Sequence, residues 1–172
     1  MSNNVAVNKS RGEAFVDFVI NRIQNDKAFR AALTRADNPA TEYQSWEYLT
    51  KWCDLDKDWE RRPVATIAAA IAGSKLKKDG HLSIGKAIAA CYDDGNKSDQ
   101  AKTKLRRLLA CSSVSEACRV LRPLLRLIAS KGKTLSYEKL LNNLMYFGDG
   151  EKVKTRWAID FYGRRDDDSI NA

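Results

Sequence analysis

Three aspartates at alternate positions, Asp54, Asp56 and Asp58, have the spacing that begins a calcium-binding loop. Such a loop needs Gly at its sixth position for a sharp turn and Glu at its twelfth position as a bidentate ligand. This chain has Trp59 and Ala65 at those two positions. The acidic run is therefore interpreted as a solvated turn and not as a metal site.

Other groupings of reactive side chains are equally incomplete. A two-metal nuclease needs carboxylates that converge on ions about 3.5–4 Å apart, and no second acidic group except Asp93–Asp94 is available to meet the first one. His81 is the single histidine and has no recognisable nucleophile partner. The segment Gly148–Lys152 is too short for a phosphate-binding loop and follows a predicted helix instead of a strand. We therefore expect that the protein is not an enzyme.

The four cysteines lie far apart and form no CxxC pair, which zinc sites usually require. We expect all four to be reduced, small hydrophobic residues and predict no metal and no cofactor. The four are Cys53, Cys91, Cys111 and Cys118.

Positive charge is concentrated in the second half of the chain. Residues 98–165 hold fifteen Lys and Arg against six Asp and Glu, whereas residues 1–97 hold fifteen against thirteen. The net charge of +8 is thus a property of the C-terminal half. A basic surface of this kind predicts a polyanionic partner, most commonly nucleic acid.

Two pairs of basic residues have helical spacing. Lys102 and Arg106 are four residues apart, and Lys152 and Arg156 repeat that spacing on the side of their segment opposite Trp157. Simple solvation of a helix face is the alternative interpretation. The excess of basic over acidic residues favours a binding surface, because a merely solvated face usually mixes both signs.

Hydrophobic periodicity predicts an all-α fold of about eight helices, arranged as one compact domain or two small packed bundles. We expect helices over residues 13–24, 27–35, 63–72, 83–92, 98–110, 114–130, 136–147 and 150–162. The stretch 64–72 has no charged residue and should be the central helix, with Pro63 opening it. Pro123 should kink or split the helix that contains it.

The chain is predicted to divide into a helical half at 1–97, a basic helical half at 98–165 and a disordered acidic tail at 166–172. No apolar run is long enough for a membrane span and the N-terminus has no signal-peptide pattern, so we expect a cytoplasmic protein without membrane contact. The aromatic segment with Tyr43, Trp46 and Trp52 is expected to pack between helices, with base stacking as the alternative.

Several motifs, taken in order, resemble the small-subunit family of type I-E CRISPR Cascade complexes, called CasB. In that family an RRLL element ends one helix, as Leu105–Leu109 does here, and a W-A-x-D-F-Y-like signature closes the last helix, as Trp157–Tyr162 does. Ser83–Ala89 (SIGKAIA) matches the short helix before the first element. The helix after it has an LRRLL-like segment in the family, in which Pro123 here replaces the second basic residue.

The resemblance implies a non-catalytic, all-α subunit of a guide-RNA surveillance complex in antiviral defence. Its partners would be crRNA, both strands of the target DNA, a repeated backbone protein and a second copy of itself. The family holds the RNA–DNA heteroduplex and the displaced strand of the R-loop through sequence-independent backbone contacts.

We expect nine basic residues to supply most of the nucleic-acid-binding groove. They are Arg35, Arg61, Arg62, Lys102, Arg106, Arg107, Lys152, Lys154 and Arg156. Two alternatives are a free-standing helical DNA-binding regulator and a basic structural bridge between acidic protein surfaces.

Overall fold

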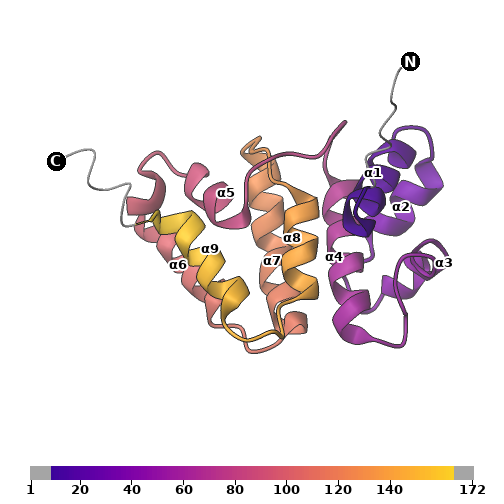
Figure 1. The fold of residues 1–172 in the computed structure, drawn as a ribbon. Helices are drawn as coiled ribbons and strands as arrows, with labels where there is room; N and C mark the ends of the chain where they lie inside the picture. The colour runs from indigo at the N-terminus through magenta and orange to yellow at the C-terminus, as the bar shows by residue number, and fades with distance from the viewer. Residues whose placement is uncertain (1–8, 165–172) are drawn as a thin grey trace, which may run out of the picture.

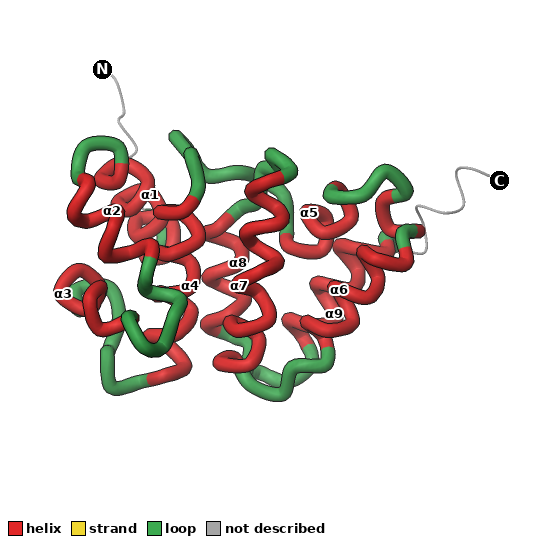
Figure 2. Tube along the Cα trace, turned by 180° about the vertical axis from the view of Figure 1, so that it is seen from behind, coloured by secondary structure: helices red, strands yellow, loops and turns green. Residues whose placement is uncertain are grey.

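The computed structural model describes residues 9–164. Within them the chain forms nine α-helices and two short 3-10 helices, and the only β-type pairing is a single parallel bridge between Leu82 and Leu135 (Figure 2). The prediction of an all-α fold is confirmed. No helix among these residues is both long and apolar enough to cross a membrane. The predicted acidic tail at 166–172 lies outside the described residues.

One end of the molecule is built by the N-terminal helices (Figure 1). Helix α1 (Arg11–Ile23) and helix α2 (Lys27–Thr34) pack against each other and against α4 (Asp58–Gly73). The connection from α2 to α4 contains the 3-10 helix η1 (Glu42–Ser45) and the one-turn helix α3 (Trp46–Leu49). Side chains of Ser10 and Asp26 cap α1 and α2 by accepting hydrogen bonds from backbone N–H groups.

Helices α7 (Val114–Ser130) and α8 (Tyr137–Met145) occupy the middle of the molecule, beside α4 (Figure 1). Ile67 and Ala68 of α4 are fully buried because α1, α2, α7 and α8 all pack around that helix. This confirms the prediction of a central, charge-free helix over 64–72.

The other end contains α5 (Ile84–Ala90), the 3-10 helix η2 (Gly95–Lys97), α6 (Asp99–Leu109) and α9 (Lys152–Tyr162). Helix α5 packs against α6 and α9. It therefore lies with the basic helices, although it precedes the boundary that we predict at residue 97. A Cβ atom on Gly85 would overlap the carbonyl oxygen of Trp157, so glycine is what lets α5 rest directly on the backbone of α9.

Both proline predictions need correction. Helix α4 begins at Asp58, so Pro63 lies inside it and does not open it. Pro63 deprives the carbonyl of Trp59 of a partner, but Trp59 is exposed in the first turn, where water can take that place. Likewise α7 runs unbroken through Pro123, since Pro123 and the residue four positions earlier, Arg119, both lie on the solvent side.

Candidate nucleic-acid interface

Helix α6 presents three of the predicted binding residues. Its buried stripe is Ala101, Leu105 and Leu108, which leaves Arg106 and Arg107 exposed and Lys102 half-buried. Among the described residues, none of these three cations has an ion-pair partner. They are therefore available to phosphate oxygens of an external ligand.

Helix α9 is fixed by its own buried stripe, Val153, Trp157 and Phe161. The indole N–H of Trp157 donates a hydrogen bond of 2.8 Å to the side-chain oxygen of Asn143 on α8, which holds the helix at one rotation about its axis. Lys152 and Arg156 are consequently exposed on one side of α9. Their predicted pairing on one helix face is confirmed.

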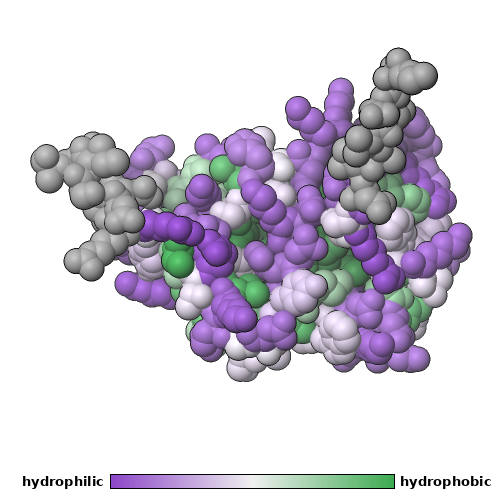
Figure 3. Space-filling view, viewed as in Figure 1, coloured by the Kyte–Doolittle hydropathy of each residue, from purple (hydrophilic) through white to green (hydrophobic). Residues whose placement is uncertain are grey.

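Arg156 borders a hollow that the sequence did not predict. This hollow has a volume of about 350 Å³ and is enclosed by the ends of α5, α8 and α9 (Figure 1). Its lining residues are His81, Ser83, Lys86, Lys139, Asn142, Asn143, Arg156 and Asp160. Hydrophilic side chains cover much of the same side of the molecule (Figure 3).

The electrostatics of the hollow favour an anion. Lys86, Lys139 and Arg156 bring three positive charges to it, against the single carboxylate of Asp160. The ammonium group of Lys139 donates a hydrogen bond of 3.1 Å to the backbone carbonyl of His81, so its charge is held in place and remains uncompensated. A phosphate group is the anion that such a cluster of Lys and Arg recognises in nucleic acid.

Lys154 is separated from the other basic residues of α9. It lies about 200° around the helix from Lys152, is half-buried, and places its ammonium group 5.6 Å from the centre of the Phe147 ring. Lys154 and Lys152 therefore cannot bind the same stretch of a nucleic-acid backbone from one face.

Arg61 and Arg62 are engaged inside the protein. Arg61 makes an ion pair of 3.1 Å with Glu42, whose side chain is only 4% exposed, and it also contacts Asp58 and the carbonyl of Leu55. The guanidinium of Arg62 lies 3.8 Å from the second oxygen of Glu42. The structure thus gives both arginines the role of compensating a buried carboxylate.

Arg35 lies at the C-terminal cap of α2, among the N-terminal helices. It is exposed and donates a hydrogen bond of 3.0 Å to the side-chain oxygen of Gln44. The nine predicted residues therefore do not form one continuous groove: those of α6 and α9 lie at one end of the molecule, and Arg35, Arg61 and Arg62 belong to the other.

The aromatic residues before α4 have different surroundings. Trp52 packs against Phe15 and Phe18 with ring centres 5.3 and 5.2 Å apart, as expected for inter-helix packing. Tyr43 is 60% exposed, and Trp46 lies under the guanidinium of Arg61. Packing accounts for Trp52, while Tyr43 keeps a free ring face.

All four cysteines are buried and unbonded to one another, in accord with the prediction. Burial raises the pKa of Cys53 and of Cys118 to about 11 and also raises the pKa of Cys91 and Cys111. In the acidic run, Asp54 pairs with Lys57 at 3.2 Å and Asp58 pairs with Arg61. Within residues 9–164, no three His, Cys, Asp or Glu side chains come together as metal ligands would.

Comparison with known proteins identifies the family. Residues 29–162 match the sequence profile of CRISPR-associated protein Cse2. This chain belongs to the Cse2 family. Among curated proteins, none matches the chain.

Solved structures share the fold. A chain of a CRISPR RNA-guided surveillance complex is 21% identical, with a TM-score of 0.74 over 88% of this chain and 91% of that one. A CRISPR-associated protein of the Cse2 family from Thermus thermophilus is 23% identical, with a TM-score of 0.72 over 91% and 100%. CasB from M. ruber is 22% identical, with a TM-score of 0.71 over 95% and 99%. The resemblance to CasB inferred from the motifs is thereby confirmed.

Neither Lys86 nor Lys139 was among the predicted binding residues. Each could be assigned to the polar face of its own helix from periodicity, because Ile84, Ala87 and Ile88 define the buried face of α5. No local pattern shows that these two faces meet Arg156.

Proposed function

We propose that this Cse2-family chain is the non-catalytic small subunit of a CRISPR RNA-guided surveillance complex. In this role it binds the backbone of the crRNA–target DNA heteroduplex and of the displaced strand, beside a repeated backbone protein and a second copy of itself. The contacts are independent of sequence because guide pairing reads the target.

The observation that carries the proposal is the cationic hollow between α5, α8 and α9. Lys86, Lys139 and Arg156 meet there around one carboxylate, and exposed Lys152 continues the positive surface along α9. Point charges on lysine and arginine recognise phosphate without reading a base. The chemistry of the hollow is that of strand positioning.

Charge reversal of the hollow in the assembled complex tests this function. Lys152→Glu with Arg156→Glu, and separately Lys86→Glu with Lys139→Glu, should weaken binding of every target sequence alike. Each lost phosphate contact on a single strand should also flatten the plot of log K against log salt by about 0.7. Titration of labelled target DNA at several salt concentrations measures both effects.

The matched control is Lys27→Glu with Lys51→Glu, which makes the same charge change at exposed positions among the N-terminal helices. It should leave the salt slope close to that of the wild type. Equal slopes for all three double variants, or a loss confined to particular sequences, would contradict the proposed backbone binding.

A further inference from the structure

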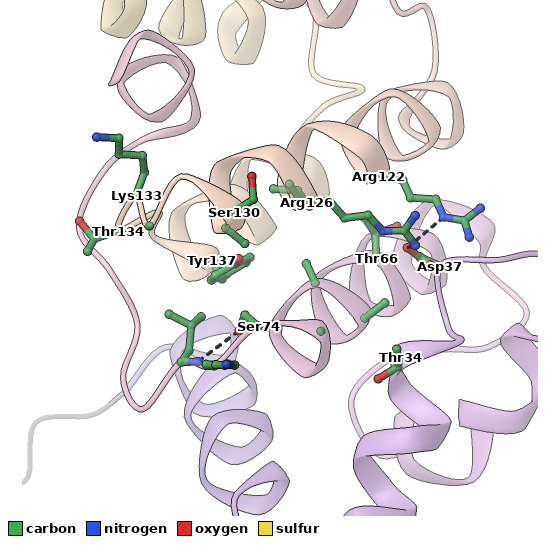
Figure 4. A pocket seen from close by; sticks show the side chains of 18 residues that line it. Thr34, Asp37, Thr66, Ser74, Arg122, Arg126, Ser130, Lys133, Thr134 and Tyr137 are labelled. Atoms are coloured by element: carbon green, nitrogen blue, oxygen red, sulfur yellow. Dashed lines mark hydrogen bonds and ion pairs between the residues drawn. The ribbon is translucent and has the colours of Figure 1, made fainter. Parts of the chain in front are cut away.

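A second concave surface, called here the α4–α7 groove, runs between these two helices and has a volume of about 610 Å³ (Figure 4). Helix α4 lines it with residues at i, i+3, i+4 and i+7 spacing, namely Thr66, Ala69, Ala70 and Gly73. None of these side chains is larger than threonine. The groove exists because this stripe of α4 is too small to fill the space beside α7.

Helix α7 lines the opposite wall with the same spacing, through Arg122, Leu125, Arg126 and Ala129. Ala69 and Leu125 are buried and form an apolar floor, whereas Ala129 is exposed at the mouth. Each stripe covers seven residues along its helix, or about 10 Å. That length corresponds to two turns of a docked helix.

Positive charge lies at both ends of the groove (Figure 4). Arg122 and Arg126 stand at one end, and Lys75 and Lys133 line the other. Among the described lining residues the only carboxylate is that of Asp37, which pairs with Arg122 at 3.1 Å and Arg126 at 3.4 Å. The side chain of Arg126 is still 64% exposed, so it keeps donors for a further partner.

This combination differs from that of the cationic hollow. A nucleic-acid strand needs phosphate contacts along its length and gains from open aromatic faces. Here the cations lie at the two ends, the floor between them is aliphatic, and the one lining aromatic residue, Tyr137, is only 3% exposed. An apolar floor with charged ends suits an amphipathic helix that is acidic at its flanks.

We propose that the α4–α7 groove binds an acidic amphipathic helix of a protein partner in the surveillance complex. Aliphatic side chains of that helix rest on Ala69 and Leu125, and its Asp or Glu residues pair with Lys75 and Lys133 at one end and with Arg126 at the other. The groove shares no lining residue with the cationic hollow, so both can be occupied together. The proposal uses the function proposed above only to name the assembly that contains the partner.

Site-specific photo-cross-linking in the assembled complex identifies the occupant. Ala129→Cys places a thiol at the mouth of the groove, and benzophenone maleimide should label it selectively because the four natural cysteines are buried. After irradiation, mass spectrometry should find the cross-link on a partner protein, in a peptide with aliphatic residues flanked by Asp or Glu. Ala28→Cys, exposed on α2 away from the groove, is the matched control and should not give that peptide.

Variants of the ends and of the floor complete the test. Lys75→Glu with Lys133→Glu should lower the yield of the Ala129→Cys cross-link at least tenfold, whereas Lys27→Glu with Lys51→Glu should leave it unchanged. Gly73→Leu should also lower the yield by filling the groove, and the fold should tolerate it because a Cβ atom there meets nothing within 4 Å. Circular dichroism and the melting temperature verify that each variant is folded.

A cross-link to RNA or DNA, a cross-link to a peptide without acidic residues, no cross-link, or a yield insensitive to the lysine reversals would each overturn the proposal. These outcomes are separable from failure of the proposed nucleic-acid function, which the salt slope of the Lys152/Arg156 variant reports. Loss of the cross-link with a normal salt slope, or the reverse, shows which of the two surfaces has been misassigned.

Discussion

The carboxylate of Asp79, in the connection between α4 and α5, accepts a hydrogen bond of 2.8 Å from the backbone N–H of Tyr137, the first residue of α8. Its other oxygen accepts one of 3.1 Å from the N–H of Glu138. Ser136 caps the same helix by accepting from the N–H of Lys139. A residue remote in sequence thus satisfies two first-turn donors that a single local cap leaves free.

We expect Asp79→Ala to lower the free energy of unfolding by about 1–2 kcal/mol, the usual cost of a lost N-terminal cap. Urea unfolding followed by circular dichroism measures the change. Asp93→Ala removes an exposed carboxylate from a turn and should change stability by less than about 0.5 kcal/mol. Equal stability of the two variants would show that the Asp79 contacts contribute nothing.

Gly85→Ala tests the close approach of α5 and α9. The added methyl group would overlap the carbonyl oxygen of Trp157 and lie 2.8 Å from the backbone nitrogen of Phe161, so one helix must move. Overpacking of this kind costs about 1–3 kcal/mol. Gly148→Ala, where a Cβ meets nothing within 4 Å, is the control and should unfold at the wild-type urea concentration. A stable Gly85→Ala variant would contradict the packing described.

Arg61→Ala separates a structural from a nucleic-acid role for this residue. It leaves the buried carboxylate of Glu42 without its nearest cation, and removing one partner of a buried ion pair costs about 3–5 kcal/mol. Thermal unfolding should therefore show a large loss of stability. Arg107→Ala, on the exposed side of α6, should melt like the wild type. If Arg61→Ala is stable and instead flattens the salt slope, Arg61 binds nucleic acid as the sequence suggested.

The buried thiols predict alkaline sensitivity. Burial raises the pKa of Cys118 to about 11, whereas a thiol in the unfolded chain titrates near 8.5. Between about pH 8.5 and 11 the unfolded state binds fewer protons than the folded one, so this thiol makes the protein less stable as pH rises through that window. Cys118→Ala should show a smaller fall in urea midpoint between pH 8 and 10 than the wild type does. Parallel falls would rule out the thiol as the cause.

The sequence predicted well those features that neighbouring residues determine. Ser98 and Asp26 cap their helices as expected, and the stripe of Val153 and Trp157 correctly placed Arg156 on the outer side of α9. These results follow from helical periodicity and from the local geometry of a first turn, which need no tertiary information.

Contacts between distant segments were beyond such reasoning. Glu42 becomes buried only because the segment after α2 folds onto α4, so nothing local to Arg61 or Arg62 revealed that both would be spent on it. In the same way, Lys86 and Lys139 meet Arg156 through the packing of three helices. Periodicity predicts the faces of a helix but does not predict which faces meet.

The contact that Gly85 permits also has a consequence for how the protein is made. Helix α5 ends at Ala90 and its partner α9 begins at Lys152, so α5 leaves the ribosome well before the surface that covers it. At about 5–20 residues per second, the delay for this separation is roughly 3–12 s. During that interval the apolar side chains of Ile84 and Ile88 have no α9 to cover them, and the nascent chain presents a site for chaperones until its last helix emerges.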